Sequence, residues 1–265
     1  MLIVISGILA CLCYLAATVL QTQTILKGVQ QGRRVTVLAG IAVAAHAVTT
    51  YEAFRTPDGF DLGIAAMLSV MALSIVVIVL LSSLRRPVDN LFVVLFPVAL
   101  LTVVLEMFPG SHTEPRSDLT TGIFAHILMS VAAYSLLTIA AAQAVLLSFG
   151  DTLLRHHQLI ILRNLPPLQT MEQLMFEMLW AGLLFLTLSI GTGFVFLEDL
   201  SGPGLVHHTV ITLAAWVVFA VLLWGRYQLG WRGAVASRWA LSGFVLLALG
   251  YFGSKVVLEV ILGRV

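Results

Sequence analysis

The sequence predicts an all-α fold, a polytopic integral membrane protein with eight transmembrane helices and both termini outside. Composition is the first reason, because 60% of the 265 residues are apolar, only 10% are charged and the mean hydropathy is +1.03. A soluble domain carries about 25% charged residues, so 14 basic and 13 acidic side chains are too few to cover a water-soluble core of this length. The second reason is that apolar runs of about 20 residues, the length that crosses a bilayer, recur along the whole chain.

Turn-forming and charged residues separate these runs. Pro57-Asp58-Gly59 follows the second run, Arg85-Arg86-Pro87 the third and Pro109-Gly110 the fourth. The fifth run is long enough to tilt or to continue as a helix past the membrane. Thr170-Met171-Glu172-Gln173 has the pattern of a capping box, which predicts the start of the sixth helix there. The predicted spans are 2–21, 35–54, 62–82, 91–108, 121–148, 173–197, 207–226 and 239–260.

The third observation is the distribution of Lys and Arg, which sets the orientation. Cytoplasmic loops carry an excess of these residues. The loops 22–34, 84–90, 149–172 and 226–238, with the adjoining helix ends, hold ten of them, whereas the opposite loops hold three. We therefore expect these four loops in the cytoplasm, and a multi-pass protein of the bacterial inner (plasma) membrane. Residues 1–265 are treated as one transmembrane domain, in which 149–172 is either an amphipathic helix on the inner surface or a simple connector.

Composition also excludes two other classes. The only cysteines, Cys11 and Cys13, point in different directions on a helix, so a disulfide-rich secreted scaffold is excluded. A net charge of +1 gives no electrostatic basis for binding nucleic acid. The lipid bilayer is the expected environment.

The informative residues of such a chain are the polar ones at membrane depth. His46 lies about eight residues inside the outer end of the second span, His126 about five residues inside that of the fifth, and His207 and His208 open the seventh. Ser130 and Tyr134 follow His126 on the same helical face. Three helices therefore place imidazoles in one outer layer, and imidazole is a frequent ligand of iron, copper and zinc. A haem held by two histidines would need them on facing helices.

These histidines also have a plainer interpretation. An intramembrane histidine is often an interhelical hydrogen-bond partner, and His207 and His208 could be interfacial residues. In the last span Tyr251, Lys255 and Glu259 share one face, either as a clamp for an anionic group such as a propionate or as a structural ion pair. Glu106, near the outer end of the fourth span, is expected to be shallow enough to reach water.

Several segments resemble a known family. The segment from His126 to Ser135, HILMSVAAYS, resembles the His-plus-Ser/Tyr helix of the CcsA/CcmC/HemX superfamily, the cytochrome c assembly family. The segment from Trp216 to Gly233 is similar to the one that follows the external loop in that superfamily. The stretches 165–172 and 251–255 resemble its YpjD-like branch.

The resemblance implies an eight-helix haem protein with an outward-facing site. His126 corresponds to the first external haem histidine and His46 to an intramembrane one, while His207 and His208 begin the helix after the external loop. One feature differs: the loop from Glu198 to Val206 has no tryptophan, whereas the assembly members carry a tryptophan-rich segment there that holds haem against apocytochrome. We therefore do not predict apocytochrome ligation.

Together these observations predict a haem-binding inner-membrane protein without a catalytic centre. Non-covalent haem b is the expected cofactor. The candidate haem-binding residues are His46, His126, His207, His208, Tyr134 and Lys255, of which the four histidines are also the candidate metal ligands. Two alternatives stay open, a membrane transporter or accessory for haem or a divalent metal, and a regulatory scaffold of tetrapyrrole synthesis. Another membrane protein is a candidate partner.

Overall fold

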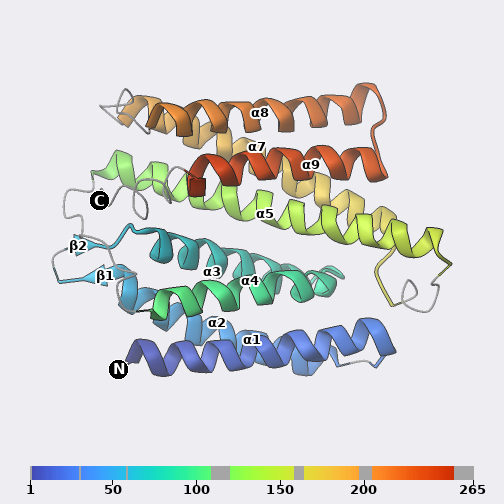
Figure 1. Cartoon of the computed structure of the whole chain (residues 1–265), viewed down its shortest axis with the longest axis horizontal. Coiled ribbons are helices and arrows are strands. Elements are labelled where there is room, and N and C mark those ends of the chain that lie inside the picture. The colour runs from blue at the N-terminus through green and yellow to red at the C-terminus, as the bar shows by residue number, and fades with distance from the viewer. Residues whose placement is uncertain are drawn as a thin grey trace. The chain divides into compact units, whose positions relative to one another are not determined.

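The computed structural model describes residues 2–29, 31–57, 59–108, 120–157, 164–196 and 205–253, apart from the side chains of residues 205–207 and of Phe252. Eight helices within these ranges are long and apolar enough to cross a membrane, which confirms the predicted class. The chain forms two compact units (Figure 1). Unit 1 comprises Met1–Ser117 and Phe149–Leu168, and unit 2 comprises Asp118–Ser148 and Gln169–Val265.

Unit 1 is a bundle of four helices, α1 to α4. In sequence order they are α1 (Leu2–Lys27), α2 (Gly32–Phe54), α3 (Ile64–Ser83) and, after the 3₁₀ turn η1 (Asp89–Leu91), α4 (Phe92–Met107). Each helix packs against the next, and α4 also packs against α1, so the four helices close a ring. Tyr14, Phe92 and Phe96 fill the interior, where the ring centroids of Phe92 and Phe96 lie 4.5 Å apart.

A short hairpin connects α2 to α3. Its strands, β1 (Arg55–Thr56) and β2 (Gly59–Phe60), are antiparallel, with Arg55 opposite Phe60. The turn between them contains Pro57 and Gly59, as the break in the sequence pattern predicted. Gly59 has a φ of 143°, a conformation that a side chain would strain.

Unit 2 also closes a ring of four helices. They are the residues of α5 (Thr121–Arg155) up to Ser148, α7 (Leu168–Phe196) from Gln169, α8 (Leu205–Gln228) and α9 (Gly233–Ala248), which ends in a π-helical turn, η2 (Leu249–Gly253). Leu137 of α5 packs where a Cβ on Gly182 of α7 would lie, so this glycine permits close approach of the two helices. The Trp216 indole of α8 donates to the Thr187 hydroxyl of α7 at 2.8 Å. Helix α9 packs against α8 and, through a bond from Tyr134, against α5.

Several helices extend past the predicted spans. Helix α1 ends at Lys27 instead of residue 21, α9 begins at Gly233 instead of residue 239, and further differences fall at the loop 149–172. The helix α5 continues to Arg155, as its length allowed, so the first residues of that loop are not a separate surface helix. Leu153 and Leu165 pack with Ile25 in the core of unit 1. The helix α7 begins at Leu168, two residues before Thr170, so Thr170 is not its N-cap, and the Gln173 amide donates to Glu177 within the helix.

Candidate functional site

His46 lies in the centre of unit 1 and is fully buried. Its Nδ1 lies 3.1 Å from the Tyr14 hydroxyl of α1, and its Nε2 lies 3.0 Å from the Ser69 hydroxyl of α3. The small residues Ala42 and Ala45, near His46 on α2, are also buried and let the neighbouring helices come close. Both ring nitrogens of His46 are therefore hydrogen-bonded to side chains.

Glu106 of α4 completes this network. Its Oε2 accepts a hydrogen bond from Ser69 at 2.5 Å and a longer one from Thr50 at 3.5 Å, and Thr50 lies 2.8 Å from Ser69. The expectation that Glu106 reaches water is wrong, because Glu106 is only 1% exposed. Although it lies one residue from the end of α4, it points at hydroxyls of α2 and α3.

The sequence interpretation missed most of this network. It selected His46 but not Tyr14, Thr50 or Ser69. Hydroxyl residues are common in membrane helices and are not typical ligands of haem or metal ions, so a search for such ligands does not select them. The usable signal was that polar residues occur at similar depth in four successive spans, which is how buried interhelical networks are built.

His126 of α5 lies in unit 2 and is partly buried, in a different environment from that of His46. Its Nδ1 lies 2.9 Å from the backbone carbonyl oxygen of Ser189 on α7 and 3.4 Å from the Thr192 hydroxyl oxygen. The Thr192 hydroxyl is within donating distance of two backbone carbonyls, of Leu188 at 2.9 Å and Ser189 at 3.0 Å. One turn further along, the hydroxyls of Ser130 and Ser189 lie 2.7 Å apart.

This environment determines the tautomer of His126. A carbonyl oxygen only accepts hydrogen bonds, so in the neutral imidazole Nδ1 carries the proton and Nε2 presents its lone pair. Among the described residues, Nε2 has no hydrogen-bond partner. A histidine that ligates a metal through one nitrogen commonly donates from the other to a carbonyl in this way.

Tyr134 and His208 lie with Tyr251 at the meeting point of α5, α8 and α9. The Tyr134 hydroxyl donates to the Leu247 carbonyl of α9 at 3.3 Å, and its ring centroid lies 5.4 Å from that of Tyr251. The His208 ring meets the Tyr251 ring edge-on at 6.1 Å. Tyr251 lies in η2, and π-helical turns occur frequently at functional sites. Unit 2 thus brings together the candidates His126 and Tyr134 of α5 and His208 of α8.

The remaining candidates are His46, His207 and Lys255. His207 lies in α8, but its side chain is outside the described part, and Lys255 and Glu259 lie outside the described residues altogether. The proposed shared face of Tyr251, Lys255 and Glu259 therefore stays a prediction. His46 belongs to unit 1 and the other histidine candidates to unit 2. The described residues contain no group of three or more His, Cys, Asp or Glu side chains that could hold a metal ion.

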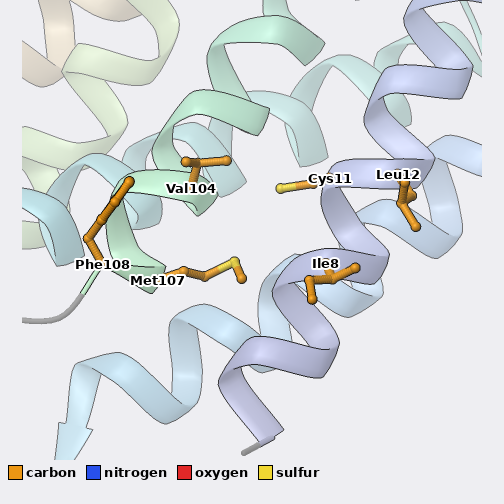
Figure 2. A pocket seen from close by; sticks show the side chains of 6 residues that line it. All are labelled: Ile8, Cys11, Leu12, Val104, Met107 and Phe108. Atoms are coloured by element: carbon orange, nitrogen blue, oxygen red, sulfur yellow. The ribbon is translucent and has the colours of Figure 1, made fainter.

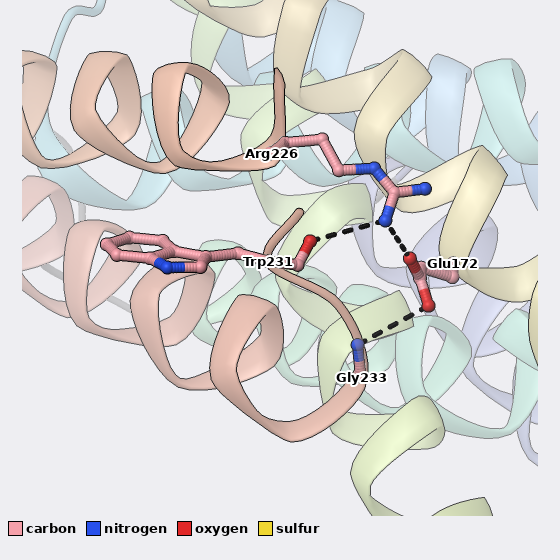
Figure 3. A network of polar contacts seen from close by, with 4 residues as sticks. All are labelled: Glu172, Arg226, Trp231 and Gly233. Carbon is pink, nitrogen blue, oxygen red and sulfur yellow. Dashed lines mark hydrogen bonds and ion pairs between the residues drawn. The ribbon is translucent and has the colours of Figure 1, made fainter. Parts of the chain in front are cut away.

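A polar cluster at the other end of unit 2 joins α7 to the α8–α9 connection (Figure 3). Arg226 of α8 donates to the Glu172 carboxylate at 2.5 Å and to the Trp231 carbonyl at 3.2 Å. The second Glu172 oxygen accepts from the Gly233 backbone N–H at 3.4 Å. The Arg226 guanidinium also lies 4.6 Å above the centre of the Phe176 ring. Glu172, predicted to be part of a capping box, is instead the centre of this clamp.

An apolar groove lies between α1 and α4 of unit 1 (Figure 2). Its volume is about 430 Å³, and Ile8, Leu12 and Phe108 on its margins are largely exposed. Cys11 and Met107 also line it, and both cysteines are free thiols, as predicted. In a membrane protein, exposed apolar side chains of this kind face lipid tails.

With this geometry in place, comparison with known proteins identifies the family. The family model described as "Cytochrome C assembly protein" matches residues 7–262. The chain belongs to the cytochrome c assembly protein family. Inner membrane protein YpjD of Escherichia coli (strain K12) is 31% identical over 236 residues, which covers 86% of this chain and 88% of that protein. Protein HemX of Brevibacillus brevis is 23% identical over 168 residues, or 59% of this chain and 60% of HemX.

No solved structure matches the chain significantly. The similarity to YpjD and the eight apolar helices establish a multi-pass protein of the inner membrane. The resemblance seen in the sequence from His126 to Ser135 and from Trp216 to Gly233 is thereby confirmed at the level of the family.

Proposed function

We propose that this member of the cytochrome c assembly family binds haem b non-covalently and that Nε2 of His126 would be one of the nitrogens that hold its iron. The observation that carries the proposal is the contact of 2.9 Å between Nδ1 of His126 and the Ser189 carbonyl oxygen. This contact fixes the ring and leaves the Nε2 lone pair available among the described residues. When bound, haem would supply an iron centre that accepts such nitrogen donors.

A second nitrogen donor would come from the start of α8. His208 stands there beside Tyr251, and His207 precedes it. A covalent c-type attachment is not expected, because it uses two cysteines in a C-x-x-C-H motif. Here Cys11 and Cys13 are separated by one residue in α1 and are followed by Tyr14.

The surroundings of His126 suit a large apolar ligand with a few polar contacts. Tyr134 and Tyr251 contribute aromatic rings next to His208. Lys255, four residues after Tyr251 in the sequence, would be the candidate partner of a propionate. We propose that haem is handled at the end of the bundle where α5 and α8 begin, which the Lys and Arg distribution predicts to be the outer side. His46 is not included, because side-chain hydrogen bonds occupy both its nitrogens.

The decisive experiment is an absorption spectrum of the full-length protein purified in detergent. We expect a b-type spectrum with two histidine ligands, which His126→Ala removes or converts to one of a single histidine ligand. His156→Ala is the matched control, because His156 is exposed just after the end of α5 and should leave the spectrum unchanged. A colourless protein that also fails to take up added haemin would refute the proposal. Binding of Zn²⁺ without haem would instead favour the divalent-metal alternative.

A further inference from the structure

The buried network of unit 1 has a chemistry of its own that haem binding at His126 does not use. Four helices contribute to it, with Tyr14 on α1, His46 and Thr50 on α2, Ser69 on α3 and Glu106 on α4. His46 is 0% and Glu106 is 1% exposed. Ionisable residues buried at membrane depth are costly and are generally retained for function. The Ser69 hydroxyl lies between these two ionisable groups and contacts both.

The hydrogen bonds around Ser69 restrict where protons can be. Its Oγ has three neighbours, His46 Nε2 at 3.0 Å, Thr50 Oγ1 at 2.8 Å and Glu106 Oε2 at 2.5 Å. A hydroxyl has one proton to donate and two lone pairs to accept with. Ser69 therefore donates to one neighbour and accepts from two. When Thr50 donates to Ser69 at 2.8 Å rather than over the longer 3.5 Å to Glu106, Ser69 has two arrangements left. It either donates to Glu106 and accepts from His46, or accepts from Glu106 and donates to His46.

We propose that His46 and Glu106 hold one proton in common and exchange it through the Ser69 hydroxyl, so that unit 1 contains a proton-binding site within the membrane domain. In one form Glu106 is a carboxylic acid that donates to Ser69, and Ser69 donates to Nε2 of a neutral imidazole. In the other form the Ser69 proton has moved to Nε2 and the Glu106 proton has moved to Ser69, which leaves an imidazolium and a carboxylate. Two O–H bonds break, one O–H and one N–H bond form, and the total charge is zero in both forms.

The hydrogen bond between His46 and Tyr14 is the same in both protonation forms, so neither form requires the side chains to move. In each form Nδ1 of His46 carries a proton and donates to the Tyr14 hydroxyl oxygen, 3.1 Å away. The Thr50 proton does not move. Because neither form leaves a net charge in the interior, the exchange avoids the cost of an isolated buried ion.

The contacts described above join His46 and Glu106 to hydroxyl groups, and other ionisable groups lie on the same helices. On α1, Cys11 and Cys13 are free thiols near Tyr14, and on α2 the nearest groups, Tyr51 and Glu52, are exposed. Further ionisable groups described at the helix ends and in the loops are Lys27, Arg33 and Arg34 at the opposite end of α1 and α2, Arg85, Arg86 and Asp89 between α3 and α4, and Arg55 and the buried Asp61 next to the hairpin. The helix α3 carries none.

A separate hydroxyl pair lies on the same two helices. The hydroxyls of Ser6 on α1 and Thr49 on α2 lie 2.8 Å apart, towards the end of the bundle where α1 begins. The site formed by His46 and Glu106 would take up or release a proton at a depth that bulk water does not reach. It is built from unit 1 alone and does not depend on haem binding in unit 2.

The test combines infrared and ¹⁵N-histidine NMR spectroscopy of the full-length protein at neutral pH. The Glu106 carboxyl signal is assigned by its loss in Glu106→Gln, and the His46 nitrogen signals by their loss in His46→Gln. We expect Glu106→Gln to shift the His46 nitrogen signals, and we expect the same change to leave them in place when Ser69 is already alanine. Ser69→Thr, which keeps the hydroxyl, should restore the coupling, and Ser74→Ala on the same helix should preserve it, because Ser74 bonds only to the Val70 carbonyl.

Three results would overturn the proposal. The first is a wild-type protein in which His46 is neutral and its ¹⁵N signals do not shift in Glu106→Gln. The second is coupling that survives Ser69→Ala, because the serine would then not be the relay. The third is a change in the carboxyl signal when choline chloride is replaced by sodium chloride, which would identify a monovalent-cation site instead. Circular dichroism of each variant verifies that the helices are intact, and retained coupling in Ser69→Thr separates a lost relay from a lost fold.

Discussion

The two units of the chain each enclose a histidine, and they hold it in opposite ways. In unit 1, hydroxyl side chains of Tyr14 and Ser69 occupy both nitrogens of His46. In unit 2, the Ser189 backbone carbonyl and the Thr192 hydroxyl approach only Nδ1 of His126. The first arrangement closes the histidine into a network, whereas the second fixes the ring and leaves one nitrogen available among the described residues. The presence of a histidine therefore does not by itself indicate whether it can bind a ligand. What decides this is whether its second ring nitrogen already has a hydrogen-bond partner.

The largest expected effect on stability comes from opening the closed network. The change His46→Ala leaves the Tyr14 and Ser69 groups without their imidazole partner, and each unsatisfied buried group costs about 1–3 kcal/mol. We expect the free energy of unfolding to fall by about 2–4 kcal/mol, cavity included. Chemical denaturation in detergent, followed by circular dichroism, measures it.

The matched variant is His126→Ala, which should be nearly neutral in apo-protein. It loses one hydrogen bond to a carbonyl, and interhelical hydrogen bonds in membrane proteins contribute about 0.6 kcal/mol on average. Equal losses of stability in the two variants would contradict the distinction between the closed and the open histidine.

The second expected effect concerns how unit 2 is held together. Unit 2 has a charged clamp near one end of its helices, where Arg226 and Glu172 have side chains only 25% and 14% exposed. Hydrogen bonds to charged groups are worth about 1.5–3 kcal/mol, so Glu172→Ala should lower the free energy of unfolding by about 2 kcal/mol.

The control for the clamp is Asp151→Ala, which removes the ion pair of Asp151 with Arg155. Those side chains are 37% and 72% exposed, and such i,i+4 pairs contribute about 0.3–0.5 kcal/mol. A loss as large as that of Glu172→Ala would show that an exposed ion pair stabilises the protein as much as the clamp does, and that the burial of Glu172 and its bond to Gly233 add nothing. The two variants are compared by the same denaturation measurement.

The sequence predicted the helices well and the polar contacts poorly, for a physical reason. Apolar runs and the turn at Pro57 and Gly59 are local features, so all eight spans could be located from them. The role of Glu106 depends on which hydroxyls other helices place beside it, and no local pattern contains that information. The same holds for Glu172, which lies inside the local pattern read as a capping box but whose partner, Arg226, is 54 residues away.

In the candidate site, too, the local features could be predicted and the long-range contacts could not. His126, Ser130 and Tyr134 could be placed on one face from their spacing, and Ser130 and Tyr134 indeed contact α7 and α9. The tautomer of His126 could not be predicted, because it depends on the carbonyl of Ser189, and every residue has a carbonyl. The division into two four-helix units was also absent from the sequence pattern, since no repeat marks it.

The smallest expected effect separates main-chain from side-chain support of the two histidines. Ser130→Ala removes the hydroxyl pair with Ser189, 2.7 Å long, but leaves the Ser189 carbonyl beside His126. We expect a stability loss of about 0.6 kcal/mol and no change in the haem spectrum, because Nδ1 keeps its acceptor. In unit 1 the equivalent change, Ser69→Ala, removes a direct partner of His46 and should shift its nitrogen signals. A haem spectrum altered by Ser130→Ala would mean that His126 is oriented by side chains as His46 is, and the contrast between the two units would fail at that point.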